Sequence, residues 1–264
     1  MPGHEYGGLL LVGAHVADME FTAGHLAAAH ARAGQPVTFL HLTAGEAGHP
    51  AKGRAAYREQ KLAEAEAAVS RLGGQCRVLG YPDGALTASP EVVAAVAAAI
   101  DEYRPDVLVT HWRGSWHPDH ANCNFAVERA LAQCRAAGTA SAPAVFYPEN
   151  WEDADGFQPD VLVDVTDVAD DWLAAARCHE LFRGGVVAFD YQGYYDALTR
   201  SRGCLAGVRR AAAFMRARCP VPQPQPGLWP TARPPAARAG EDTSCGSLFG
   251  GHLSTWSLRG RRSR

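Results

Sequence analysis

The amino-acid sequence predicts an α/β fold of Rossmann-like type, with a mainly parallel sheet and helices on both of its faces. Short apolar runs alternate with stretches of helical periodicity through much of the chain, and this alternation is typical of βαβ units. Two of the apolar runs, at residues 9–12 and 107–109, each lead into a loop that contains histidine. Because ligands bind at the strand ends of an open parallel sheet, these two loops are the first candidates for a functional site.

Each expected element has a local signature. The strands are short apolar runs bounded by turn residues, and they are expected, in chain order, at residues 9–14, 37–43, 77–81, 107–111, 144–147 and 161–165. The helices repeat apolar residues at helical spacing, and they are expected at residues 21–33, 55–72, 90–103 and 119–137. Ser89 can cap the third helix with its hydroxyl group. Glycines follow the other three, at Gly34, Gly73 and Gly138, as they do at many helix ends.

The composition fits one enzyme-sized domain. The chain has 264 residues, of which 47% are hydrophobic and 20% are charged, an ordinary balance for a globular protein. A net charge of -3 argues against a nucleic-acid-binding surface. We see no signal peptide and no apolar run long enough to span a membrane. The seven cysteines lack CxxC spacing, so we expect a reduced, cytoplasmic protein without a disulfide framework.

The composition changes near the C-terminus. We expect residues 1–218 to form the domain and residues 219–264 to form a disordered tail. Pro, Arg, Ser and Gly dominate this tail, and such a composition buries too little apolar surface to offset the entropy lost on ordering. The basic end, from Arg259 to Arg264, is expected to be solvated rather than bound to an acidic partner.

Two histidine motifs share one spacing. His15 precedes Asp18 by three residues, and His117 precedes His120 by three residues. Both motifs follow an expected strand, so both should lie at the same edge of the sheet. Two such loops could supply three ligands to one divalent metal and leave one coordination position open, which is the arrangement of catalytic zinc sites.

At these motifs the sequence resembles the PIG-L/LmbE-like family of zinc-dependent N-deacetylases. The family's first motif, Ala-His-Pro-Asp-Asp-Glu, is similar to Ala-His-Val-Ala-Asp-Met-Glu at residues 14–20. Its second motif, His-Pro-Asp-His, is present at residues 117–120. Residues 43–48, 81–84 and 147–151 also resemble family segments. Several matches in the right order make the resemblance more specific than a single metal-ligand motif.

The resemblance implies hydrolysis of an acetamide, often on an amino sugar. It implies that His15, Asp18 and His120 hold a metal ion, for which Zn2+ is expected. His117 would contact the developing oxyanion and protonate the leaving amine, and Asp119 would orient His117. This chemistry is consistent from physical principles, because a bound metal polarises a carbonyl and lowers the pKa of its water to about 7.

The chain departs from the family pattern at two acidic positions. The family's general base immediately precedes the metal-binding Asp, and that position is Ala17 here. Glu46, or His117 acting as both base and acid, is the candidate for its replacement. Glu20 could also reach the site, although the family pattern places an acid there behind the ligands. Ala212 stands where the family often has Glu, and the role of that carboxylate stays open.

Three classes of function compete. The prediction is a metal-dependent hydrolase that removes an acetyl group from an N-acetylated small molecule, such as an amino sugar or a glycoside. The alternative, favoured by Ala17, is a non-catalytic metal- or sugar-binding protein of the same fold. A dinucleotide-dependent oxidoreductase is disfavoured because the first turn lacks Gly-x-Gly-x-x-Gly. The substrate, the native metal and the existence of a homo-oligomer stay open.

Several other polar and aromatic residues are expected to be structural. The helix at residues 55–72 should expose a charged face that includes Arg58, Lys61 and Glu64. Isolated histidines are expected to lie in the core or on the surface, and these are His25, His30, His41, His49, His111, His179 and His252. The residues that could line a sugar pocket, but more often pack beneath loops, are Trp112, Trp116, Trp151 and Asn150.

Overall fold

A single mixed sheet forms the centre of the protein. The computed structural model describes residues 7–138 and 143–217. The strands in these residues are β1 Leu9–Gly13, β2 Val37–Thr43, β3 Gln75–Tyr81, β4 Val107–Thr110, β5 Ala144–Pro148, β6 Val161–Asp164 and β7 Ala211–Arg216. Their order across the sheet is β3-β2-β1-β4-β5-β7-β6. The first five strands are parallel, whereas β7 runs antiparallel to both β5 and β6.

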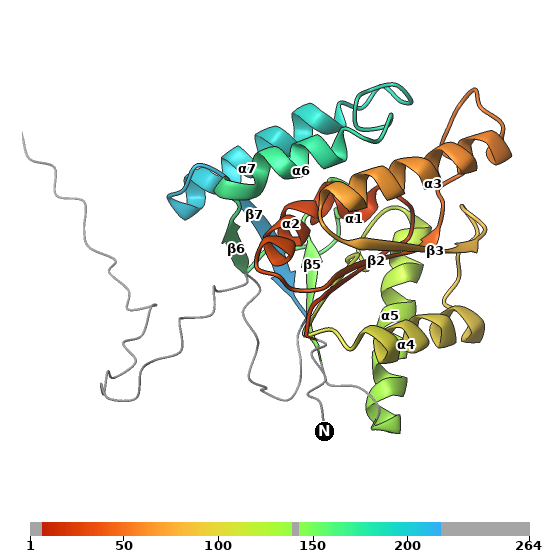
Figure 1. Cartoon of the computed structure of the whole chain (residues 1–264). Coiled ribbons are helices and arrows are strands. Elements are labelled where there is room, and N and C mark those ends of the chain that lie inside the picture. The colour runs from red at the N-terminus through yellow and green to blue at the C-terminus, as the bar shows by residue number, and fades with distance from the viewer. Residues whose placement is uncertain (1–6, 139–142, 218–264) are drawn as a thin grey trace, which may run out of the picture. The chain divides into compact units, whose positions relative to one another are not determined.

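Helices cover both faces of this sheet. The α-helices of the described residues are α1 Asp18–Thr22, α2 Gly24–Arg32, α3 Arg54–Arg71, α4 Pro90–Tyr103, α5 Pro118–Ala137, α6 Ala169–Ala176 and α7 Tyr191–Ala206. Helices α4 and α5 lie on one face, and α1, α2, α3 and α6 lie on the other (Figure 1). The predicted α/β fold, mainly parallel and with helices on both faces, is therefore confirmed.

The strand β1 shows why an uninterrupted apolar run is needed. Successive side chains of a strand point to opposite faces of the sheet. Leu11 accordingly packs in a core cluster with Leu26 of α2, whereas its neighbour Leu10 packs with Val96 of α4 and Val127 of α5. Both faces of β1 are buried, as is usual for parallel strands between two helical layers.

Local signals predicted the elements of the first 165 residues well. The six expected strands correspond to β1 to β6, within two residues at each end. Ser89 caps α4, because its Oγ accepts a hydrogen bond from the amide of Val92 at 3.4 Å. Gly138 follows α5 with a left-handed φ of 65°. The helix expected at residues 21–33 is instead two helices, since Ala23 adopts a non-helical φ of -138° between α1 and α2.

Three later elements have no clear signal in the sequence. Neither α6, α7 nor β7 was expected. The strand β7 begins with three alanines, a residue that has little intrinsic preference for strands. Its conformation is decided by hydrogen bonding between β5 and β6, which makes the far edge of the sheet antiparallel.

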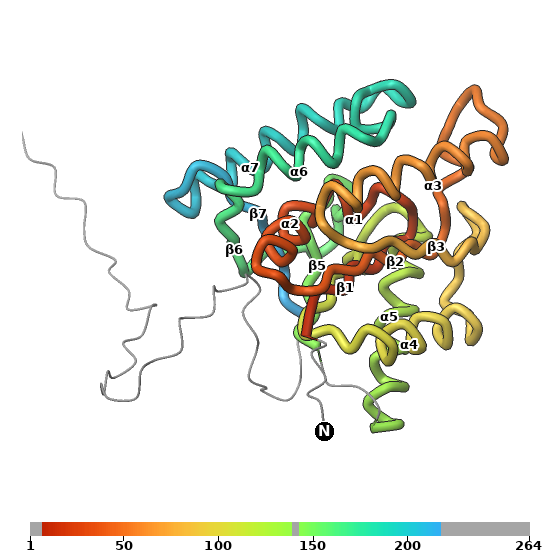
Figure 2. Tube along the Cα trace, viewed as in Figure 1, coloured from red at the N-terminus to blue at the C-terminus, as the bar shows by residue number. Residues whose placement is uncertain are grey.

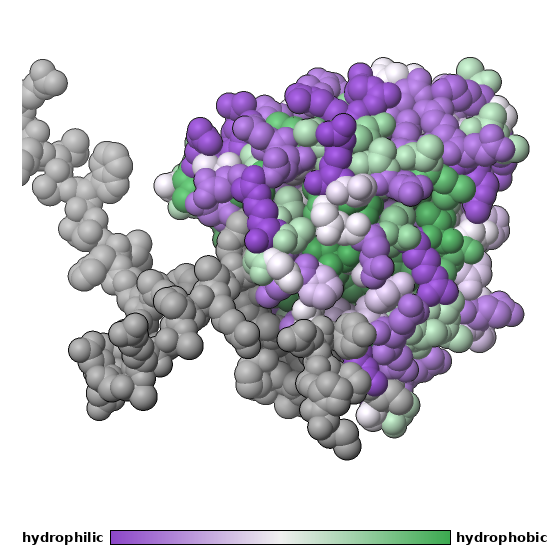
Figure 3. Space-filling view, viewed as in Figure 1, coloured by the Kyte–Doolittle hydropathy of each residue, from purple (hydrophilic) through white to green (hydrophobic). Residues whose placement is uncertain are grey.

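The surface is mixed, and no membrane span is found. On the face drawn in Figure 3, hydrophilic residues cover the outer helices and hydrophobic residues show between them. In the described part of the chain, no helix is long and apolar enough to cross a membrane.

The strand order brings distant loops together. The chain passes outward from β1 to β3 and then returns, so that β4 pairs with the other side of β1. Such a reversal is the place where open α/β sheets bind ligands. The tube in Figure 2 shows the segments that follow β1 and β4 at the same edge of the sheet.

Removal of the C-terminal segment tests the predicted domain boundary. The tail predicted at residues 219–264 lies outside the described residues, and β7 already ends at Arg216. We expect a chain that ends at Arg218 to unfold in one cooperative transition, with a Tm within about 4 °C of the full chain, because a loss of about 1 kcal/mol shifts a domain of this size by that amount. Thermal unfolding followed by circular dichroism measures this. Aggregation, or a much larger loss of Tm, would show that the tail stabilises the domain.

Candidate metal centre

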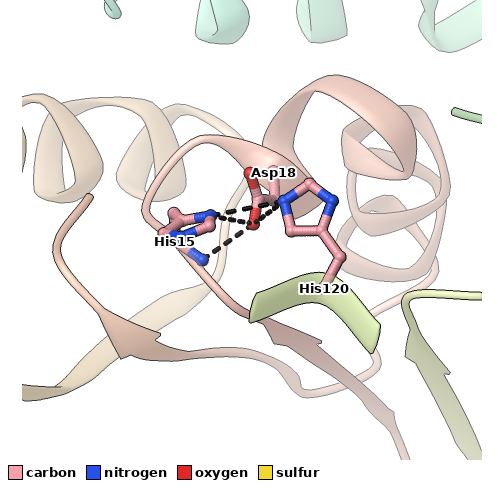
Figure 4. Close-up of side chains that lie close together, drawn as sticks. All are labelled: His15, Asp18 and His120. Atoms are coloured by element: carbon pink, nitrogen blue, oxygen red, sulfur yellow. Dashed lines mark hydrogen bonds and ion pairs between the residues drawn. The ribbon is translucent and has the colours of Figure 1, made fainter. Parts of the chain in front are cut away.

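Three side chains from two loops converge beside the ends of β1 and β4. His15 lies in the turn after β1, Asp18 begins α1, and His120 lies in the first turn of α5 (Figure 4). The Nδ1 atom of His15 is 3.2 Å from Oδ2 of Asp18. The Nε2 atom of His120 is 3.3 Å from Nδ1 of His15 and 3.4 Å from Oδ2 of Asp18. One nitrogen or oxygen from each residue therefore faces a common point.

This spacing suits a small divalent metal ion. Zinc binds histidine nitrogen and carboxylate oxygen at about 2.0–2.2 Å, and two ligands of a tetrahedral ion are then about 3.3–3.6 Å apart. The three observed separations are close to this range. Two imidazole nitrogens and one carboxylate oxygen are also a ligand set found in catalytic zinc sites, where a fourth position holds water or substrate. The residues present therefore fit a metal of this type.

Carboxylates contact the other ring nitrogen of each histidine. The Nε2 atom of His15 lies 3.1 Å from Oδ1 of Asp83 and 3.3 Å from Oδ2 of Asp119. The Nδ1 atom of His120 lies 2.9 Å from Oε2 of Glu152. A carboxylate in this position holds the proton on its own side of the ring and leaves the opposite nitrogen free to bind a metal. Both histidines are thus oriented toward the same point from behind.

The orienting role of Asp119 differs from the expectation. Its carboxylate was expected to contact the ring of His117, but it contacts His15 instead. The reason is the loop after β3, because Oδ2 of Asp119 accepts a hydrogen bond from the amide of Gly84 at 2.7 Å and Oδ1 accepts one from Leu86 at 3.2 Å. These two bonds hold the carboxylate on the side of His15, and His117 and Asp119 are hydrogen-bonded through the backbone amide of Asp119 rather than through its carboxylate.

His117 caps α5 and faces the cavity. Its Nδ1 accepts a hydrogen bond from the backbone amide of Asp119 at 3.2 Å. A neutral imidazole that accepts at one nitrogen carries its proton on the other, so Nε2 of His117 is a donor. Burial, together with the neighbouring His120 and His15, lowers the pKa of His117 and favours this neutral form. The ring is therefore suited to donate a hydrogen bond rather than to accept a proton at Nε2.

The ligand residues are strongly coupled to one another. Burial alone would lower the pKa values of both histidines, but the surrounding carboxylates together outweigh it. Asp18 and Glu152 raise the pKa of His120 to about 9, and Asp18 with Asp119 and Asp83 raises the pKa of His15 well above its usual value. Burial would raise the pKa of Asp18, yet His120 and His15 hold it well below its usual range. Protons and a metal ion would compete for the same atoms, as expected for a metal site.

Three residues singled out in the sequence do not line the cavity above these ligands. Glu46 lies behind Asp83, whose backbone amide donates to Oε1 of Glu46 at 3.2 Å. Ala17 is 1% exposed and packs in a cluster with Phe21 and Trp172. Its neighbour in that loop, Glu20, is also buried and lies 3.3 Å from Nε2 of His41. The structure therefore brings none of these three positions to the cavity wall.

Gly45, adjacent to Glu46, has a structural role of its own. It lines the cavity and adopts a left-handed φ of 76°. A Cβ atom at this position would lie 3.2 Å from Cβ of His15. The loop after β2 can therefore approach the metal ligands so closely because this residue is a glycine.

A cavity of about 180 Å³ opens over the three ligands. Its wall includes Lys61, Asn150 and Trp151. From the sequence, Lys61 was expected on a solvated helix face, and Asn150 and Trp151 were expected to be structural. Lys61 is only 2% exposed, and its Nζ donates to the carbonyl of Val16 at 2.7 Å. The expectation of a solvated face is therefore wrong for Lys61, because α3 packs over the loop that carries the ligands. Trp116, in contrast, is 72% exposed.

Sequence reasoning missed three residues that contact the ligands, and it misplaced Glu64. Asp83 had a usable signal, since Pro-Asp-Gly follows a strand that ends at the same sheet edge. Glu152 had none, because it lies in an irregular loop after β5. His111 was expected to be an isolated structural residue, yet its Nε2 lies 3.0 Å from Oδ2 of Asp18 and its ring stacks on that of His120 with centroids 3.9 Å apart. Glu64, expected to be solvated, is buried beside Lys61 on α3.

The chain is similar to known proteins of one family. The family model described as GlcNAc-PI de-N-acetylase (PIG-L) matches residues 10–131. A 1D-myo-inositol 2-acetamido-2-deoxy-alpha-D-glucopyranoside deacetylase of Mycobacterium sp. (strain KMS) is 30% identical over 223 residues, which cover 65% of this chain and 72% of the relative.

A hydratase is also among the similar proteins. A 4-oxalmesaconate hydratase of Pseudomonas putida (strain KT2440) is 27% identical over 185 residues, which cover 64% of this chain and 71% of the relative. The crystal structure of GalB, the 4-carboxy-2-hydroxymuconate hydratase of Pseudomonas putida KT2440, superimposes with a TM-score of 0.75 at 22% identity, over 83% of this chain and 98% of that structure. This chain therefore belongs to the PIG-L family, in which its relatives include both deacetylases and a hydratase.

Proposed function

We propose that this protein is a zinc-dependent hydrolase that removes the acetyl group from an N-acetylated small molecule, with amino sugars and their glycosides as the preferred class. The observation that carries the proposal is the convergence of His15, Asp18 and His120, with a carboxylate behind each histidine and a cavity in front. The deacetylase relative from Mycobacterium supports the reaction type.

The chain's own groups would bind and orient the acetamide. When bound, zinc supplies Lewis-acid polarisation of the amide carbonyl and makes hydroxide available near neutral pH. His117 would donate a hydrogen bond from Nε2 to the oxygen that gains negative charge. To protonate the leaving amine as well, the neutral ring would first take up the proton that the attacking water gives up. The N-cap hydrogen bond from the amide of Asp119 holds His117 in the tautomer that this role needs.

The methyl side chain of Ala17 cannot accept a proton from water, so another group would have to do so. His117 could serve only if its Nδ1 released the amide of Asp119 or if its tautomer changed. Glu46 would have to move, because it lies behind Asp83. The carboxylates that already line the cavity are Asp18, Asp83 and Glu152. Zinc lowers the pKa of water enough that assistance by a nearby base could be weak here.

A second candidate function is the hydration of an unsaturated small molecule. The similarity to the Pseudomonas hydratase favours it. A non-catalytic protein that binds metal or sugar is the third candidate, and the absence of a carboxylate at Ala17 favours it. Assays of the zinc-loaded protein on N-acetyl-D-glucosamine, on glycosides of that sugar and on unsaturated dicarboxylates separate the three. Turnover of the acetamides alone supports the proposal, whereas turnover of the unsaturated acids alone would replace it with hydration.

Replacement of a ligand tests the metal site itself. We expect His120→Ala to lose most of the bound zinc, because the two ligands that remain, His15 and Asp18, cannot hold the ion in a tetrahedral site by themselves. Elemental analysis of the purified protein measures the loss. His49→Ala changes a histidine whose ring contacts Tyr57 and none of the three ligands, so it should keep full occupancy. Full zinc content in His120→Ala would contradict the assignment.

The carboxylates behind the histidines should control metal affinity. We expect Asp119→Asn and Glu152→Gln each to weaken zinc binding about 10–100-fold, since such partners fix the tautomer and orientation of a ligand histidine. Competition with a chelating dye measures the affinity. The exposed Glu102→Gln serves as the matched control. Unchanged affinity in Asp119→Asn would mean that its bond to His15 has no role in metal binding.

The missing general base gives a further test. Position 17 is buried in an apolar cluster, so Ala17→Asp should destabilise the fold by about 1–3 kcal/mol and should not accelerate turnover. Chemical denaturation and steady-state kinetics measure the two effects. A rate gain of about 100-fold or more would instead show that a carboxylate there reaches the reacting water.

Loss of activity in Glu46→Gln, with an unchanged Tm, would assign the base to Glu46.

A further inference from the structure

Asn150 presents a side-chain amide to the cavity over the metal ligands. It lies two residues beyond the end of β5 and lines the cavity together with His117 and His120. The proposed chemistry assigns no task to this side chain. An amide in such a position can either donate or accept a hydrogen bond, so its function depends on which end faces the cavity.

Two neighbours fix the orientation of this amide. On one side, Tyr195 donates a hydrogen bond from its hydroxyl group to Oδ1 of Asn150 at 2.8 Å. On the other side, Nδ2 of Asn150 lies 3.5 Å from Oε2 of Glu152. A carboxylate that already accepts from the ring of His120 cannot face an amide oxygen without repulsion. The Asn150 nitrogen therefore belongs on the side of Glu152, and the oxygen belongs on the side of Tyr195.

This orientation leaves hydrogen-bonding capacity in the cavity. The amide nitrogen carries two N–H groups, and the 3.5 Å contact to Glu152 is long and accounts for one of them at most. Among the described residues, no other acceptor for Nδ2 of Asn150 is found within hydrogen-bond distance. An N–H group in the wall of a substrate cavity can be satisfied by an oxygen of the ligand.

We propose that Asn150 determines specificity by donating this N–H to a hydroxyl or carbonyl oxygen of the substrate, close to the acetamide that reacts. We further assign Tyr195 as a positioning residue that keeps the donor end of Asn150 toward the cavity. The choice of an amino sugar as substrate rests on the proposed function, whereas the donor role of Asn150 rests on the contacts of its amide.

The location of Tyr195 suits a positioning role. Tyr195 belongs to α7, is 4% exposed and packs against Phe21. Its hydroxyl group is therefore held in place by a buried ring. Removal of that hydroxyl group leaves the ring packing intact but lets the amide of Asn150 rotate. The adjacent Tyr194 packs against Phe189 and does not line the cavity, which makes it a matched control.

The test compares four variants of the zinc-loaded full chain, namely Asn150→Leu, Tyr195→Phe, the double variant and Tyr194→Phe. Isothermal titration calorimetry with N-acetyl-D-glucosamine and with D-glucosamine gives Kd, and steady-state kinetics with the former gives KM and kcat. We expect Asn150→Leu to raise Kd and KM about 3–10-fold, as for the loss of one neutral hydrogen bond, with a smaller change in kcat. Tyr194→Phe should leave all three values unchanged.

The double variant separates positioning from general structural damage. If Tyr195 acts through Asn150, Tyr195→Phe should weaken binding in the wild-type background and change nothing further in Asn150→Leu. Independent losses that add together would overturn the positioning role. An unchanged Kd in Asn150→Leu, or no binding of either sugar by the wild-type chain, would overturn the donor role. Wild-type sugar binding that depends on Asn150 without any turnover would contradict the proposed hydrolysis and leave the inference standing.

Discussion

The parallel pairing of β1 with both β2 and β4 is the constraint on which the rest of the structure depends. Leu9 is in register with Val37 on one side and with Val107 on the other, so the three strands end at one edge of the sheet. The turn after β1 and the start of α5 consequently face each other, and His15 meets His120 although 105 residues separate them. The pairing of β1 with β4 brings His120 to His15 and Asp18, which already lie in one turn.

Polar bonds between loops then fix the geometry at this edge. The carboxylate of Asp119 joins the start of α5 to the loop after β3, and the carboxylate of Asp83 accepts from the amide of Ala47 in the loop after β2 at 2.6 Å. The carboxylate of Glu46 in turn accepts a hydrogen bond from the backbone amide of Asp83. A metal site needs such support, because ligands must be held close to their final positions before the ion binds. The carboxylates that tie the loops together also orient the histidines.

The two positions at which this chain lacks the family's carboxylate have different surroundings. Ala17 lies in an aromatic cluster, whereas Ala212 belongs to the apolar core and borders a small cavity that His25, Glu149 and Arg202 also line. Burial lowers the pKa of His25 to about 3, so its ring is neutral there. The apolar cluster around Ala17 thus matches the residue present. This correspondence is the physical reason to seek proton transfer among the carboxylates and imidazole that already line the cavity.

The sequence by itself determined the strands β1 to β6, most of the helices and the three candidate ligands. Those features depend on local signals, namely apolar runs, caps and the three-residue spacing of His15 with Asp18 and of His117 with His120. Only the tertiary structure decided the partner of Asp119, the burial of Lys61 and the approach of Glu152 and Asn150 to the cavity. Glu152 and Asn150 lie in an irregular loop without periodicity. Lys61 and Asp119 lie on expected helices, but their partners Val16 and Gly84 come from loops that are distant in the chain. Their contacts follow from strand order and helix packing, which no short stretch of sequence specifies.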